Sequence, residues 1–139
     1  WTSVRGGVDI HGKVVTRKGF IIAGLQGSMR YKAHGDYMYT EAEMRRAIAQ
    51  LVPRLLWNRR RFGRALDILV THSPPYGIHD RSDLPHTGFK VLLSFLRLFR
   101  PRYHLHGHIH IYRQDEVTQT RYEDTTVVNV YPYRVLEVL

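Results

Sequence analysis

The sequence predicts an α/β fold, in which short strands and amphipathic helices alternate along a single chain. Apolar residues recur at helical spacing after Thr40 and again after Phe89. Between and beyond these segments, runs rich in β-branched residues stand at Leu66–Thr71 and Thr125–Val130. Because strands and helices follow one another in turn, we expect a parallel or mixed sheet with its functional side chains at the carboxyl ends of the strands.

The first part of the chain predicts a β-hairpin followed by a helix. Apolar pairs on either side of Gly19, within residues 13–23, predict two short strands. Thr40 and Glu43 have the spacing of a capping box, in which each side chain accepts from the other residue's backbone amide. The apolar pattern that follows predicts a helix from Glu41 to about Asn58, and Pro53 should kink it or divide it in two.

The remainder of the chain predicts four strands and a second helix. A strand ending at Thr71 delivers His72 to a long polar loop, after which an amphipathic helix runs from Phe89 to Phe99 and stops at Pro101. The other strands are expected at Tyr103–Leu105, Thr125–Val130 and Arg134–Leu139. Two of the predicted strands therefore end directly before histidine-bearing loops.

Composition restricts the class of protein. At 139 residues the chain has the size of one domain, and its 43% apolar and 24% charged residues are typical of folded proteins. It contains no run of 18 uncharged apolar residues, so no membrane partner is expected. The absence of cysteine excludes disulfides and thiolate metal sites and favours a cytoplasmic protein.

The charge balance favours anionic partners. The chain has 21 Lys and Arg against 12 Asp and Glu, a formal net charge of +9. Such a charge suits phosphate esters and nucleic acids alike, although the basic residues are dispersed and no motif indicates nucleic acid. The oligomeric state is not encoded in these features.

Four histidines stand at alternate positions, at His104, His106, His108 and His110. In an unbroken strand all four would share one face, but Gly107 permits a turn after which the last two diverge. Neutral imidazoles suit zinc, manganese or iron, whereas no acidic residue stands at a ligand-like spacing beside them. From the residues alone, a structural role and a metal-binding role both stay open.

Two motifs in order make the sequence resemble the calcineurin-like metallophosphoesterases. Residues 67–75, Asp-Ile-Leu-Val-Thr-His-Ser-Pro-Pro, and residues 107–110, Gly-His-Ile-His, match the last two metal motifs of that family. The resemblance implies a sandwich of mixed sheets flanked by helices, of which this chain would form the C-terminal half. It also implies that His72 and His108 bind one metal ion and His110 the other, from a pair of divalent Mn, Fe or Zn ions.

The family's earlier motifs, Asp-x-His, Gly-Asp-x-x-Asp and Gly-Asn-His-Asp/Glu, have no counterpart in residues 1–139. By resemblance, the bridging carboxylate and the histidine that acts as general acid should lie upstream of Trp1. We therefore expect residues 1–139 to form a single partial domain that lacks the N-terminal half and full activity. Ser73 stands where many members of the family have glycine.

Several other residues are weaker candidates for the site. His106, His86, His79 and Asp80 are candidates for contact with the metal ligands or the substrate, and for each an ordinary structural role is the alternative. The implied reaction is hydrolysis of phosphomonoesters or phosphodiesters by water that two metal ions activate. The alternative function is a non-catalytic module that binds anions or nucleic acid on a degenerate phosphoesterase fold.

Overall fold

The computed structural model describes residues 6–138. Within this range the chain forms eight strands, two α-helices and one short 3₁₀ helix. In chain order these are β1 (Lys13–Arg17), β2 (Phe20–Leu25), β3 (Ser28–Met29), β4 (Met38–Tyr39), α1 (Glu41–Phe62), β5 (Ile68–Thr71), η1 (Leu84–His86), α2 (Lys90–Phe99), β6 (Tyr103–His106), β7 (Gln119–Tyr122) and β8 (Thr125–Asn129). The predicted α/β alternation is confirmed.

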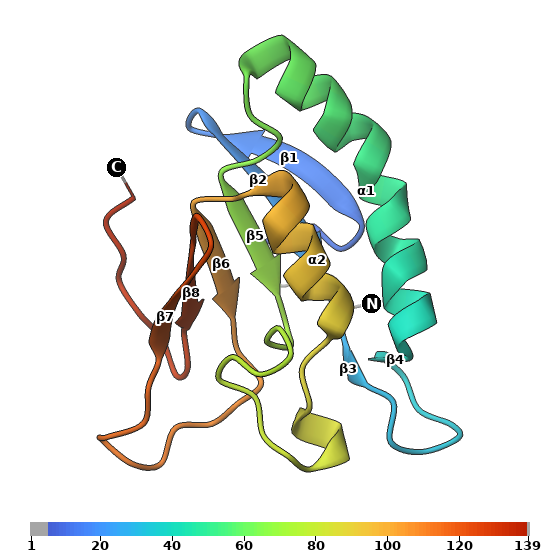
Figure 1. The fold of residues 1–139 in the computed structure, drawn as a ribbon, viewed down its shortest axis with the longest axis vertical. Coiled ribbons are helices and arrows are strands. Elements are labelled where there is room, and N and C mark those ends of the chain that lie inside the picture. Colours follow the sequence, from blue (N-terminus) through green and yellow to red (C-terminus); the bar gives the residue numbers. More distant parts are fainter. Residues whose placement is uncertain (1–5, 139) are drawn as a thin grey trace.

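Six of the strands form one mixed sheet in the order β1-β2-β5-β6-β8-β7 (Figure 1). The four central strands are parallel, and β1 and β7 pair antiparallel at the two edges. The remaining strands, β3 and β4, form a separate small parallel pair. Because parallel strands share a direction, the carboxyl ends of β2, β5, β6 and β8 meet at the lower edge in Figure 1, where the long loops gather.

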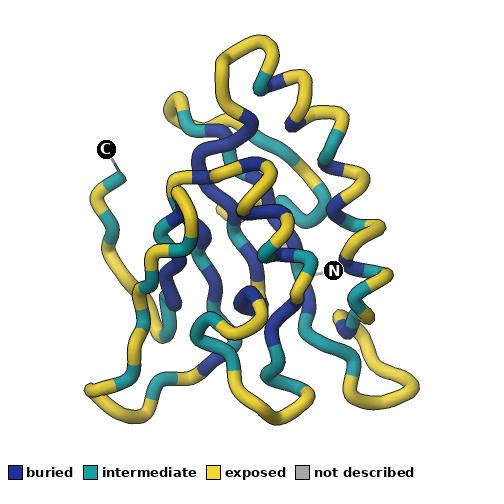
Figure 2. The backbone as a smooth tube through the Cα atoms, viewed as in Figure 1, coloured by how far each residue is buried: buried dark blue, intermediate teal, exposed yellow. Residues whose placement is uncertain are grey.

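Both helices cover the same face of the sheet, since their apolar stripes join one core cluster with residues of β2, β5 and β8 (Figures 1 and 2). Helix α1 begins with the predicted capping box of Thr40 and Glu43 and ends at Gly63, which has a left-handed backbone. It continues through Pro53 without being divided and extends four residues beyond Asn58. The prediction that Pro53 could divide the helix is therefore wrong.

The C-terminal region differs from its prediction. A strand at Gln119–Tyr122, which the sequence pattern did not predict, pairs with β8. The strand predicted at Arg134–Leu139 is wrong for residues 134–138, which have no regular structure, and Leu139 lies outside the described residues. The pattern of residues 119–122 is polar because β7 is an edge strand with alternate exposed positions.

The sheet face opposite the helices is also apolar. By register, Ile22 and Ile68 stand side by side on this face, as do Val70, Leu105 and Val128. Three of these side chains, those of Ile22, Val70 and Leu105, are only half-buried. In the described part of the chain, no helix packs over this face.

Among the helices described, none is both long and apolar enough to cross a lipid bilayer.

Candidate metal centre

The candidate site lies where β5 and β6 end. His72 follows the last residue of β5, and Gly107 and His108 follow the last residue of β6. The Gly107 amide donates to the His72 carbonyl at 3.1 Å, which joins the two loops just beyond the sheet. His108 has a left-handed backbone with φ of 66°, which turns the chain out of the strand direction. The predicted divergence of the last two histidines from the strand face is thus confirmed.

His72 and His108 face each other across this junction. Their ring centroids are 4.6 Å apart and their planes are inclined by 55°. Desolvation lowers the pKa of both imidazoles, and repulsion from His108 lowers the pKa of His72 further. The neutral form of both rings, which is the form that binds metal ions, is therefore favoured.

The loop that precedes α2 fixes the tautomer of His108. Nε2 of His108 lies 2.8 Å from the Pro85 carbonyl oxygen. A carbonyl oxygen only accepts, so Nε2 carries the proton and donates, and Nδ1 is left with a free lone pair. An imidazole that donates one N–H to a backbone carbonyl while its other nitrogen stays free has the arrangement of a metal ligand.

His110 stands apart from this pair. Its exposed ring stacks on Tyr131, with ring centroids 4.2 Å apart and an angle of 13° between the planes. Its Nδ1 lies 3.3 Å from the Tyr112 hydroxyl oxygen. A cavity of about 320 Å³ joins His110 to His108 and His86. His108 thus lies between His72 on one side and His110 on the other.

The two candidates in the loop between β5 and α2, His86 and Asp80, have different surroundings. Nδ1 of His86 contacts the Asp83 carboxylate, and the His86 ring lies 5.0 Å from the His108 ring, centroid to centroid. This hydrogen bond holds the pKa of Asp83 below its usual range. Asp80 lies within the loop and accepts from the Gly88 amide at 2.9 Å, so its carboxylate shapes the loop.

The buried His106 and the half-buried His79 form a chain of hydrogen bonds. Nδ1 of His106 donates to the Gly107 carbonyl at 3.0 Å, so Nε2 of His106 accepts from Nδ1 of His79, also at 3.0 Å. Nε2 of His79 then accepts from the Thr120 hydroxyl at 2.8 Å. Burial is the main cause that lowers the pKa of His106, to about 4. Both histidines are thereby held neutral behind the loop that carries His108.

His104 belongs to the core beneath the site. It is fully buried, and its Nε2 lies 2.7 Å from Oγ1 of Thr71. The Thr71 hydroxyl donates to the Ser73 carbonyl at 2.6 Å, so it accepts from Nε2–H of His104. Nδ1 of His104 is therefore an acceptor, and it has no hydrogen-bond partner among the described residues. Burial lowers the pKa of His104 well below its ordinary value.

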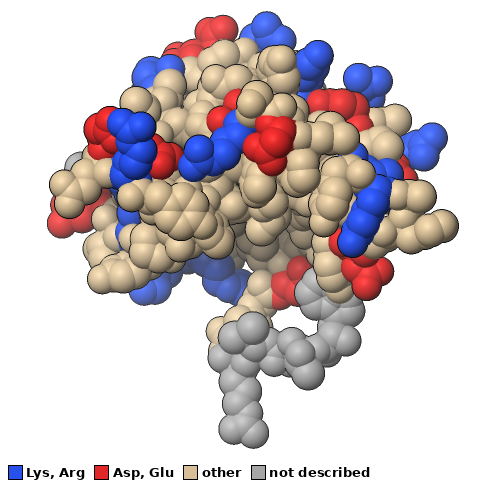
Figure 3. Space-filling view, turned by 90° about the horizontal axis from the view of Figure 1, so that it is seen from below, with Lys and Arg blue, Asp and Glu red and all other residues tan. Residues whose placement is uncertain are grey.

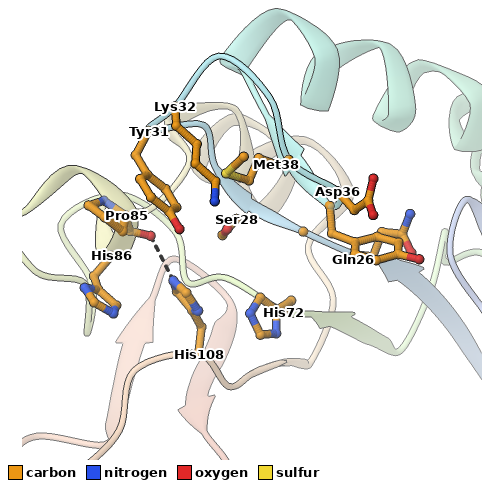
Figure 4. Close-up of a pocket in the computed structure, with 13 residues that line it drawn as sticks. Gln26, Ser28, Tyr31, Lys32, Asp36, Met38, His72, Pro85, His86 and His108 are labelled. Carbon is orange, nitrogen blue, oxygen red and sulfur yellow. Dashed lines mark hydrogen bonds between the residues drawn. The ribbon is translucent and has the colours of Figure 1, made fainter.

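A cavity of about 750 Å³ opens beside the two facing histidines (Figure 4). Its walls come from the β2 end, from the segment between β3 and β4, and from η1. The lining residues are Gln26, Gly27, Ser28, Tyr31, Lys32, Gly35, Asp36, Tyr37, Met38, His72, Pro85, His86 and His108. Figure 3 looks onto this end of the molecule, where side chains of both charges are interspersed around the rim.

The donors present fit part of a metal site. Within residues 6–138, no three His, Asp or Glu side chains lie close enough together to hold a metal ion. His72 and His108 nevertheless supply two neutral, adjacent imidazoles, and one of them has its second nitrogen anchored. Paired divalent ions also need hard carboxylate ligands, and the Asp36 carboxylate that lines the same cavity does not form a three-donor group with these histidines among the described residues.

Pattern reasoning missed three features of this site. The Pro85 carbonyl is a backbone group, so no residue type encodes it. The cavity wall with Tyr31 and Lys32 lies in a polar loop without a spacing signal. Arg30, which suits a phosphate contact by type, instead binds Glu43 and the Met38 carbonyl.

A mixed α/β sheet with facing histidines at the ends of its parallel strands defines a protein of the metallophosphoesterase fold class. The chain belongs to the calcineurin-like phosphoesterase family, whose model matches residues 7–112. No curated protein matches the chain significantly.

A solved structure supports the fold. The crystal structure of TT1561 of Thermus thermophilus is similar with a TM-score of 0.52 at 16% sequence identity. The similarity covers 87% of this chain and 48% of that chain, so this chain spans about half the length of the solved protein. At this identity the likeness shows the fold alone.

Proposed function

We propose that this protein is a metal-dependent phosphoesterase, in which His72 and His108 hold one divalent ion and His110 contributes to a second. The observation that carries the proposal is the pair of facing imidazoles, of which His108 donates Nε2–H to the Pro85 carbonyl. Membership of the calcineurin-like phosphoesterase family supports the reaction class. Mn, Fe and Zn are the ions that the imidazole donors suit.

The residues of the chain have separate tasks in this proposal. Pro85 holds the His108 ring so that Nδ1 faces away from the loop, and the His79–His106 chain supports the backbone from which His108 departs. The 750 Å³ cavity beside His72 receives the ester. The chemistry that bound divalent ions supply in such sites is the activation of water and the polarisation of the phosphoryl group.

The general acid and the bridging carboxylate belong to family motifs that residues 1–139 do not contain. The proposal therefore assigns to this chain the metal-binding histidines and the ligand cavity, and it assigns the remaining ligands to an upstream segment. In a chain that carries those motifs, we expect Mn²⁺-dependent cleavage of bis(p-nitrophenyl) phosphate, which His108→Ala abolishes.

Metal binding tests the proposal directly. We expect isothermal titration with Zn²⁺ to show binding that His72→Ala and His108→Ala each weaken by at least about 10-fold, because each removes one of two adjacent donors. The matched control is His34→Ala, which removes an exposed histidine outside the pair. Equal affinity in all four proteins, or no retained metal together with salt-sensitive binding to nucleic acid, would instead favour the non-catalytic binding module.

A further inference from the structure

We propose that the segment between β3 and β4, residues 30–37, is the ligand-recognition wall of the cavity. In this inference Lys32 binds the phosphate of the ligand and Tyr31 packs on a planar aromatic group, so that the substrate class is a nucleotide-like phosphate ester. The inference rests on the proposed function, since it places the phosphate of that ester beside His72 and His108.

The first argument is position. Tyr31, Lys32, Asp36 and Tyr37 all line the cavity that also contains His72 and His108. Figure 4 shows the Lys32 amino group and the Tyr31 hydroxyl pointing into the cavity from the wall opposite the two histidines. A ligand held between the two walls would meet the histidines on one side and these side chains on the other.

The second argument is charge. Among the residues that the structure describes, Lys32 forms no ion pair, and its ammonium group lies over the Tyr31 ring, 5.5 Å from the centroid. The cavity lining also includes the Asp36 carboxylate, which forms no ion pair with Lys32 among the described residues, so the exposed ammonium group stays available to attract an anion beside the two histidines. A phosphate group would gain a charge-assisted hydrogen bond from it.

The third argument is size and shape. A cavity of about 750 Å³ is far larger than a phosphate ion needs and falls within the range of sites for drug-sized ligands. Tyr31 is 49% exposed and Tyr37 is 48% exposed, on the same segment. Exposed aromatic rings beside a phosphate-sized anion site are suited to stacking on a base.

The fourth argument is that the base of the segment is fixed. The Ser28 amide donates to the Tyr37 carbonyl at 2.9 Å, and the Arg30 amide donates to the Tyr39 carbonyl at 3.0 Å. The Ser73 hydroxyl donates to the Gly27 carbonyl at 3.0 Å, which joins the segment to the His72 loop. A wall tied to the loop that carries His72 keeps its place relative to that histidine, which lowers the entropic cost of ligand binding.

Calorimetry with three probes tests this inference: AMP, ribose 5-phosphate and adenosine, each with the protein in the presence of Mn²⁺. We expect AMP to bind more tightly than the other two. Lys32→Met should weaken AMP and ribose 5-phosphate by about 10-fold, as expected for loss of one charge-assisted hydrogen bond, and leave adenosine unchanged. Lys18→Met, which removes the same charge at the β1–β2 turn, should change none of the three affinities.

Tyr31 is tested by the ratio of the AMP and ribose 5-phosphate affinities. Tyr31→Ala should lower this ratio by about 5-fold or more, the scale of one lost base stack, whereas Tyr31→Phe should retain it. Tyr133→Ala, which removes a tyrosine that is 81% exposed and outside the cavity, is the matched control.

Two results would overturn the inference. One is that Lys32→Met binds AMP and ribose 5-phosphate as tightly as Lys18→Met does, and the other is that Tyr31→Ala leaves the ratio of the two affinities unchanged. Failure of the proposed function gives a different result: Zn²⁺ does not bind, or His72→Ala and His108→Ala bind it as tightly as the wild type does. Metal binding that persists while Lys32 and Tyr31 have no effect would retain the proposed function and reject this wall as the recognition element.

Discussion

His104 and His108 come from one strand and its continuation, yet their ring nitrogens have different partners. Nε2 of His108 donates to a carbonyl and leaves Nδ1 open beside His72, whereas Nε2 of His104 donates to Thr71 and leaves Nδ1 buried without a partner among the described residues. The first arrangement suits metal binding, while the second gives a neutral imidazole that protonation would disrupt.

Acid should therefore destabilise the protein through His104. Its pKa is lowered in the folded state by burial, whereas an ordinary imidazole titrates near pH 6.5. The unfolded chain then binds a proton that the folded chain does not, so stability is present above about pH 6.5 and falls as the pH decreases. One such group contributes a slope of up to about 1.4 kcal/mol per pH unit.

Urea unfolding between pH 7.5 and 5 measures this dependence. We expect His104→Leu to unfold with a shallower pH dependence than the wild type, because the leucine cannot titrate. His34→Leu, at an exposed position, should retain the wild-type slope. Parallel slopes in all three proteins would show that the protonation of His104 does not limit stability.

At the residue scale, the sequence predicted the course of the backbone around the histidines better than it predicted the partners of their rings. The alternation of His104, His106, His108 and His110, with Gly107 between them, correctly predicted that the last two leave the strand face. It could not distinguish a core imidazole from one beside a cavity, because that depends on partners far along the chain.

Among the elements, the β2–β3 turn connects the sheet to the cavity wall, and Gly27 is its critical residue. Its φ is +93°, and a Cβ atom there would lie 2.2 Å from Cε2 of Tyr39 and 2.8 Å from the Tyr37 carbonyl oxygen. Any side chain at this position would therefore push the wall away from its base. The β2–β3 turn therefore packs directly against the base of the cavity wall.

Gly27→Ala should lower the free energy of unfolding by about 2–4 kcal/mol, since it combines an unfavourable φ with a steric clash. Gly19→Ala is a matched control, because Gly19 has φ of +82° but no atom within 4 Å of the Cβ position. Gly19→Ala should lower the free energy of unfolding only by the cost of the unfavourable φ, about 1–2 kcal/mol. Equal losses in chemical denaturation of the two variants would contradict the close packing at Gly27.

The elements that sequence reasoning predicted correctly are those with strong local signals. The capping box of α1 and the apolar run of β5 are examples. Pro53 does not divide α1, because tertiary packing of the buried stripe around it, including Leu51 and Leu55, holds the helix together. The edge strand β7 was missed because its pairing with β8, rather than its own pattern, defines it.

For the whole molecule, the important asymmetry lies between the two faces of the sheet. One face is covered by both helices, and the opposite face leaves Ile22, Val70 and Leu105 half-buried. An apolar surface of this kind tends to associate with another apolar surface.

We expect concentration-dependent self-association through this face in sedimentation velocity experiments. Leu105→Lys should abolish it, because a charge then stands among Val70 and Val128. Leu98→Lys, at a position 57% exposed on α2, introduces the same charge elsewhere and should leave association unchanged. Circular dichroism establishes that both variants are folded, and a wild type that stays monomeric at every concentration would refute this expectation.

The attachment of the cavity wall has an evolutionary consequence. Residues 30–37 are fastened at their base, through Gly27, Arg30 and the β3–β4 pair, while the side chains at the tip contribute little to the core. The side chains in the middle of this segment can therefore vary between related sequences without disturbing the histidines at the strand ends. Under the proposed function, substitutions in residues 30–37 would change ligand specificity while the metal-binding histidines stay the same.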